Sequence, residues 1–303
     1  MRNFPPVLNK SKQYLPLLLK ILVFAGCTAV LVFKFQDSEY NWYRIFEELA
    51  SLPWFILPLL MCVSLASWLV ESKKWQFLVG DFYGLRFRES VLQNLTAQAA
   101  SFITPLRSGE FVAKALYFPK SLRKQVTQRV FIGNFSQMAV TVAVGIIGLF
   151  VYEQELMDDT WKYVGLIILT GLLIFLAYSW VRKKLGLNAV RSDLWFKTVG
   201  FSTLRYLIFS SNWLLVLGVL YYDQSIVTIL SCITVWYLLI STIPLIQILD
   251  LPVRILAVVT IFPGDTEIVL LATTLIWITN TVFPTVLGCA LLPFKSRIEL
   301  ETA

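Results

Sequence analysis

The stretch VFIGNFSQMAVTVAVGIIGLFVY, residues 130–152, decides the fold class of this chain, because its 23 residues include no charged side chain. A helix needs about 20 apolar residues to cross the hydrocarbon core of a bilayer. Seven further apolar runs flank this one, at residues 15–35, 52–70, 161–181, 199–221, 225–243, 244–262 and 268–292. The sequence therefore predicts an all-α integral membrane protein with about eight transmembrane helices.

The composition excludes most classes of soluble enzyme. Hydrophobic residues make up 57% of the chain and charged residues 15%, whereas a soluble domain is about half apolar and a quarter charged. The chain has no histidine, which excludes Ser-His-Asp and Cys-His nucleophiles and a zinc site built on imidazole. We expect no metal and no cofactor.

Lysine and arginine are distributed unevenly between the predicted loops. With both termini placed in the cytoplasm, 21 of the 26 bases lie on the inner side, 3 lie outside, and Arg205 and Arg254 lie in the membrane. Such a bias is the usual sign of orientation in a cytoplasmic membrane. We interpret the net charge of +7 in this way and expect no nucleic-acid partner. The prediction is a single polytopic domain, residues 1–303, with cytoplasmic tails at 1–14 and 293–303 and no appended soluble domain.

The segment Val91–Thr104 is too short and too polar for an ordinary membrane span. It contains Asn94 and several other amide and hydroxyl side chains, and Pro105 ends it. A re-entrant hairpin or an interfacial helix fits this pattern. A full crossing would place the basic stretch 114–129 outside, so the charge count favours the re-entrant hairpin.

The residues that follow this segment form the first candidate site. If a helix begins near Ser108, then Arg107, Glu110 and Lys114 share one face. A helix start offers free backbone N–H groups and a positive dipole end, and two added bases suit a phosphate head group. Glu110 could hold Arg107 in place or recognise an ammonium group. The alternative is a cytoplasmic loop whose bases touch anionic lipid without specificity.

The stretch 244–254 forms the second candidate site. Asp250 and Arg254 lie in an apolar stretch that contains Pro244 and is broken by Pro252, and ionisable residues in such a setting are usually paired and functional. Their spacing allows them to pair across one helical turn. The alternative is a neutral pair with a structural role in a kinked helix.

Both candidate sites are apolar elements interrupted by proline that carry an acid and a base. Transporters built from two repeats place broken helices at corresponding positions, so a two-repeat, transporter-like architecture is possible here. Arg205 lies about seven residues into its run, and we expect its side chain to snorkel to the inner surface. The candidate substrate-binding residues are Asn94, Arg107, Glu110, Lys114, Arg205, Asp250 and Arg254, with Pro105, Gly109, Pro244 and Pro252 as candidate structural residues.

Three features resemble the lysylphosphatidylglycerol synthase transmembrane-region family. These are the Lys74-Trp75 step, the Pro105-x-Arg107-x-Gly109-Glu110 pattern with Lys114 downstream, and the broken stretch Pro244–Arg254. The resemblance implies a bacterial or archaeal membrane protein whose best-understood relatives act as flippases for an aminoacylated phospholipid. A separate soluble domain aminoacylates the lipid in those relatives, and we do not expect that domain here. The chain departs from the family at Asp250, where a glycine-rich region is usual, and at Ile255, which replaces a glutamate.

These observations leave three functional hypotheses. The first is a lipid-translocating protein, not an enzyme, that binds an anionic or phosphate-bearing head group at Arg107 and Lys114, with Asp250 and Arg254 lining the same cavity. The second is a membrane-embedded transferase acting on a lipid-linked substrate, with Glu110 or Asp250 as base. The third is a non-catalytic scaffold for an envelope enzyme. Membrane lipids are the expected partners, with a homo-oligomer or an envelope enzyme as further possibilities.

Overall fold

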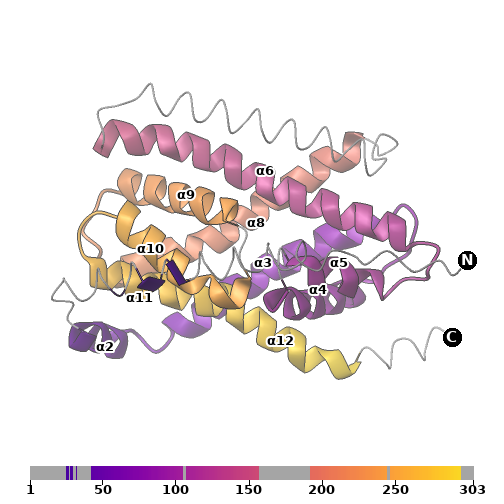
Figure 1. Cartoon of the computed structure of the whole chain (residues 1–303), viewed down its shortest axis with the longest axis horizontal. Helices are drawn as coiled ribbons and strands as arrows, with labels where there is room; N and C mark the ends of the chain where they lie inside the picture. Colours follow the sequence, from indigo (N-terminus) through magenta and orange to yellow (C-terminus); the bar gives the residue numbers. More distant parts are fainter. Residues whose placement is uncertain are drawn as a thin grey trace, which may run out of the picture.

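The computed structural model describes residues 42–104, 107–156, 192–243 and 246–294, with a few residues between 25 and 32 (Figure 1). Every secondary-structure element in these ranges is helical, as predicted. Several predicted features lie outside the described residues. They are the N-terminal tail 1–14, most of run 15–35, run 161–181, Pro105, Pro244 and the C-terminal tail beyond residue 294.

Among the described residues, four long helical segments form the frame. Three are long and apolar enough to cross a membrane, at residues 56–79, 123–152 and 266–291, and they coincide with the predicted runs 52–70, 130–152 and 268–292. The fourth corresponds to run 199–221 but begins earlier. The segments are α3 (Ile56–Val79), α6 (Arg123–Leu156), α8 (Ser192–Val219) and the continuous α11 (Thr266–Trp277), π-helical η4 (Ile278–Val282) and α12 (Phe283–Leu291).

Helix α3 continues nine residues beyond Val70, where the apolar run ends. The buried residues of α3 recur every three or four positions and therefore share one face of the helix, as in an amphipathic helix. That face is apolar at Ile56 and Leu60, polar in the middle, and apolar again at Leu78. The charge count includes Lys74 among the inner bases between the apolar runs, but Lys74 lies on helix α3, in the polar middle of this face, and is 1% exposed.

Helices α4 (Phe87–Phe102) and α5 (Ser108–Ala115) form an antiparallel pair. The Thr96 hydroxyl lies 2.8 Å from the Tyr117 hydroxyl near the open end, and Gly109 lies against Ala100 near the tip. A Cβ on Gly109 would lie 2.4 Å from the Ala100 carbonyl oxygen, so only glycine allows the two helices to approach this closely. The segment Val91–Thr104 supplies most of the first arm of this hairpin, and its re-entry into the membrane stays a prediction.

A second antiparallel pair is formed by α9 (Ile226–Thr242) and α10 (Leu251–Ile261), with the 3-10 turn η3 (Gln247–Leu249) between them. The Trp236 indole donates to the Arg254 carbonyl at 3.1 Å, and Cys232 contacts the Ile261 carbonyl. Because 11 residues rise about 17 Å and the hydrocarbon core is about 30 Å thick, α10 cannot cross a membrane alone. The predicted crossing at 244–262 is therefore corrected to one arm of a hairpin. Pro252 lies in the first turn of α10 and does not kink it.

The two hairpins oppose each other. At their tips the Gln98 amide donates to the Gln247 side chain at 3.1 Å, while their open ends lie toward opposite ends of the long axis in Figure 1. The open end of α9–α10 lies near contacts of Tyr222 with Pro263 and of Asp265 with Arg44, which is on α2 (Trp42–Ser51). The charge count predicts that all of these loops lie on the outer side of the membrane. In the structure they lie at the same end of the molecule, as that prediction requires.

In the part of the chain that the structure describes, two apolar cores lie on either side of a polar layer. The first core joins α8, α9, α10 and α11 around Trp213 and Trp236, and the second surrounds Trp75 and Phe118 beside α6. The polar middle of α3 lies between the part of the helix that enters the first core and the part that enters the second. This layer holds the candidate site.

Candidate functional site

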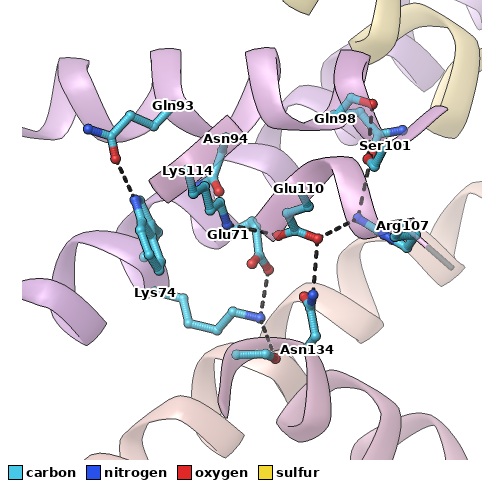
Figure 2. A network of polar contacts seen from close by, with 12 residues as sticks. Glu71, Lys74, Gln93, Asn94, Gln98, Ser101, Arg107, Glu110, Lys114 and Asn134 are labelled. Carbon is cyan, nitrogen blue, oxygen red and sulfur yellow. Dashed lines mark hydrogen bonds and ion pairs between the residues drawn. The ribbon is translucent and has the colours of Figure 1, made fainter. Parts of the chain in front are cut away.

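Glu110 on α5 is the centre of the first charged group, as Figure 2 shows. The Lys114 ammonium donates to Oε1 at 2.8 Å, and both Arg107 at 3.4 Å and the Asn134 amide at 3.0 Å donate to Oε2. Because α5 begins at Ser108, the three charged residues lie on one helical face, as their spacing predicts. Asn134 comes from α6, so the carboxylate also joins the hairpin to a long helix.

Lys114 is held inside the protein and does not extend toward a ligand. Its side chain is 2% exposed, and its ammonium lies 4.3 Å from the centre of the Trp75 ring. An aromatic face stabilises a desolvated cation. Lys114 therefore neutralises Glu110 and fixes the position of its carboxylate. Of the two bases that contact Glu110, Arg107 is the accessible one.

A second charged group surrounds Glu71 on α3. Its Oε2 accepts from the Lys74 ammonium at 2.7 Å and from the Arg205 guanidinium at 2.9 Å. Arg205 also stacks over the Trp68 ring at 4.9 Å. The expectation that Arg205 snorkels to the surface is wrong, because Glu71, buried on the neighbouring helix, offers a closer partner than solvent.

Lys74 extends the second group to α6 and α8. Its ammonium also donates to the Gly133 carbonyl and the Ser202 hydroxyl, each at 3.3 Å. Glu71 and Lys74 are not among the site residues predicted from the sequence. Their three-residue spacing, in phase with the buried positions of α3, is the signal that could have identified them.

The polar side chains of α4 connect the hairpin to its surroundings. Gln93 accepts from the Trp75 indole at 2.7 Å, Asn94 donates to the Ser72 hydroxyl at 3.3 Å, and Gln98 accepts from Arg107 at 3.4 Å. Asn94, a candidate substrate-binding residue, is 2% exposed and joins α4 to α3. Gln98 links Arg107 to the tip of the opposing hairpin.

Arg107 combines three unusual properties. Its backbone is left-handed, with φ of 55°, a conformation that costs a residue other than glycine free energy and is often found at functional sites. Its side chain is 40% exposed, yet its Nε is buried without a hydrogen-bond partner. Both of its contacts are long, so the guanidinium can accept a stronger partner at little cost.

The start of α5 is less open to an anion than the sequence suggests. The Gly109 N–H, one of the amides expected to be free, donates to the Thr104 hydroxyl at 2.8 Å. This hydroxyl takes the place that a phosphate oxygen would occupy on that amide. An anion placed at this site would therefore meet chiefly the guanidinium of Arg107.

Asp250 and Arg254 form the predicted ion pair, at 2.8 Å. Asp250 also accepts from the Trp277 indole at 2.9 Å, and Arg254 lies over the Trp236 ring at 5.6 Å. The pair is electrically neutral. Among the described residues it reaches the first group through Gln247, whose carbonyl accepts from the Asp250 N–H at 3.4 Å, and then through Gln98. Within the described ranges, no three histidine, cysteine or acidic residues are grouped as a metal site would require.

A helical protein with spanning helices, two opposed hairpins and a buried charged layer belongs to the class of polytopic membrane proteins. The profile of the lysylphosphatidylglycerol synthase TM region matches residues 17–279, and the chain belongs to this family. The family that the three sequence features resemble is thus confirmed. A search of curated proteins finds no match.

Proposed function

We propose that this protein moves a phosphate-bearing lipid from one leaflet to the other, with Arg107 as the residue that binds the head group. The observation that carries the proposal is the state of Arg107: a strained backbone, a part-exposed guanidinium and a buried Nε without a partner, at the tip of a hairpin. Arginine can bind a phosphate through two parallel hydrogen bonds. Glu110 and Lys114 position it, and no covalent step takes place.

The opposed hairpins support alternating access. In transporters with inverted repeats, substrates bind where broken helices meet near the middle of the membrane. Here the tips meet at Gln98 and Gln247, one hydrogen bond away from Arg107. Rocking of one hairpin against the other would open Arg107 to each leaflet in turn, with Asp250 and Arg254 lining the second half of the path.

Reconstitution tests the proposal directly. The purified chain is placed in liposomes with fluorescent phosphatidylglycerol, and the fraction of probe accessible to dithionite is followed over time. Faster exchange than in protein-free liposomes, with the probe chemically unchanged, is the expected result. A chemically modified lipid would identify a transferase. Neither exchange nor modification, with co-purification of an envelope enzyme, would support a scaffold.

Arg107→Lys tests the role of the guanidinium. Lysine keeps the charge but acts as a point charge, so we expect exchange to fall by at least about tenfold if bidentate binding matters. The matched control is Arg88→Lys, an exposed base on α4 that should exchange lipid at the wild-type rate. A well-inserted Arg107→Lys protein with full activity would remove Arg107 from the site.

We also propose that both termini are cytoplasmic in the cytoplasmic membrane. A single cysteine at Asp223, in the loop between α8 and α9, should react with an impermeant maleimide in intact cells. A cysteine at Lys120, in the loop after α5, should react only after permeabilisation. The reverse labelling pattern would invert the topology.

A further inference from the structure

The charged layer consists of two groups with the same composition. Each contains one glutamate, one lysine and one arginine, and we call them the Glu110 triad (Arg107, Glu110, Lys114) and the Glu71 triad (Glu71, Lys74, Arg205). In each triad a carboxylate is bound by two cations, and a cation stacks on tryptophan, Lys114 on Trp75 and Arg205 on Trp68.

The triads together carry more positive than negative charge. Four bases face two carboxylates, which leaves two positive charges in excess. Lys114 also acts electrostatically on Glu71, so the triads form one charged layer. An uncompensated charge is costly at membrane depth and usually marks the place where a counter-charge binds.

Within the two triads, the buried atoms without a hydrogen-bond partner are donors. The Nε–H groups of Arg107 and Arg205 are both buried without a partner, and both are donors that an anionic oxygen would satisfy. Each carboxylate, in contrast, already accepts from two cations. The nearby Gln137 Oε1 is an acceptor without a partner, but it carries no charge to balance an ammonium group.

We propose that the two triads select a lipid head group with net negative charge and exclude one that carries a free amine. The inference rests on the proposed function and specifies its substrate class. An ammonium group brought to this layer would meet two excess positive charges and no uncommitted carboxylate among the described residues of the triads. The head group selected here therefore differs from the aminoacylated phospholipid implied for the best-understood relatives.

The test is lipid competition on the purified full chain, read by native mass spectrometry at pH 7. The probes are phosphatidate, phosphatidylglycerol, phosphatidylethanolamine and lysyl-phosphatidylglycerol, whose charges run from about −2 to +1, because a phosphate monoester has its second pKa near 6. We expect retention to fall in that order, with at least about tenfold between phosphatidylglycerol and its lysyl ester. Equal or stronger retention of the lysyl ester overturns the inference.

Variants of two neighbouring lysines distinguish the effect of the triad charges from that of general surface charge. Lys74→Met removes one excess charge from the buried layer and should shrink the preference for phosphatidate over phosphatidylglycerol several-fold. Lys73→Met removes an exposed charge one residue away and should leave the preference unchanged. If both variants reduce the preference equally, surface attraction explains it and the inference fails. Arg107→Gln, at a part-exposed position, makes the same test if Lys74→Met does not fold.

The outcomes also separate this inference from the proposed function. Lipid exchange in liposomes together with equal retention of all four probes would leave translocation standing and overturn the charge selection. Selective retention of anionic probes without lipid exchange would support the charge selection and overturn translocation.

Discussion

The hairpins α4–α5 and α9–α10 share a plan and differ in chemistry. Each has a longer arm of 16 or 17 residues, a tip, and a shorter return arm of 8 or 11 residues. The buried face of α4 carries glutamine, asparagine, threonine and serine, whereas α9 buries mostly apolar side chains in the first core. The polar arm makes side-chain bonds to the charged layer and the apolar arm packs against its neighbours.

The return arms extend this contrast. On α5 the carboxylate of Glu110 is shared among three donors and belongs to a layer with excess positive charge. On α10 the pair of Asp250 and Arg254 is neutral and is held by two tryptophans. Under the proposed function, this difference assigns the ligand to α4–α5 and makes α9–α10 the partner against which α4–α5 moves.

The largest expected effect is the loss of the Glu110 carboxylate. Glu110→Gln leaves Lys114 buried without a counter-charge, which can cost several kcal/mol. Asp250→Asn disturbs a neutral, less buried pair and should cost less. Thermal unfolding of the purified proteins in detergent, with Glu47→Gln at an exposed position of α2 as control, measures the order. A larger loss for Asp250→Asn would reverse our assignment of the two hairpins.

Gly109→Ala should have the next largest effect. The added methyl group would collide with the backbone of α4, at Ala100, and overpacking of this kind costs about 1–3 kcal/mol. Gly218→Ala on α8 is the control, because nothing lies within 4 Å of a Cβ there and alanine favours helix. The unfolding temperature should fall for Gly109→Ala and stay level or rise for Gly218→Ala. Equal behaviour would mean that the hairpin is more open than the structure has it.

The two hairpins also show what sequence could and could not predict. Arg107, Glu110 and Lys114 lie on one face because local helical spacing decides it, and the pair of Asp250 and Arg254 follows from the same rule. Hydropathy cannot distinguish two membrane crossings from the two arms of a hairpin. The apolar run 244–262 therefore predicts a crossing, whereas α10 has only 11 residues.

The Glu71 triad was missed for a different reason. Lys74 stands in a short run of bases after an apolar run, the usual pattern of a membrane-surface loop. Its burial depends on how far α3 continues and on the packing of α8 against it, which brings Arg205 to Glu71 across 134 positions of sequence. Pairings at such separations are decided by tertiary packing, which periodicity does not encode.

A double-mutant cycle on Asp250 and Arg254 should show an effect of about 1 kcal/mol. Asp250→Asn and Arg254→Gln each leave a part-buried charge without its partner, so the double variant should lose less stability than the sum of the single losses. The cycle is read from unfolding midpoints in detergent. Simple additivity would show that the pair contributes no interaction energy and that tryptophan contacts alone hold α10.

The smallest expected effect lies at the contact between the two tips. Gln98→Ala and Gln247→Ala each remove one side of a neutral hydrogen bond, and such bonds within membranes contribute about 0.6 kcal/mol on average. Gln98→Ala should cost more by itself, because Gln98 also accepts from Arg107 and Ser101. Their coupling, measured from unfolding midpoints, should exceed the near-zero coupling between Gln98→Ala and the remote Gln224→Ala.

The same pair has a kinetic consequence that stability alone would not show. If the tip contact closes the path between the leaflets, Gln247→Ala should speed lipid exchange in liposomes. Retention of phosphatidylglycerol should stay unchanged, because Arg107 donates to the amide oxygen of Gln98, whereas Gln247 accepts from its amide nitrogen. Gln224→Ala should change neither quantity. Slower exchange in Gln247→Ala would mean that the contact stabilises the transition state between the two open states. Unchanged exchange would mean that the movement of α4–α5 does not depend on its contact with α9–α10.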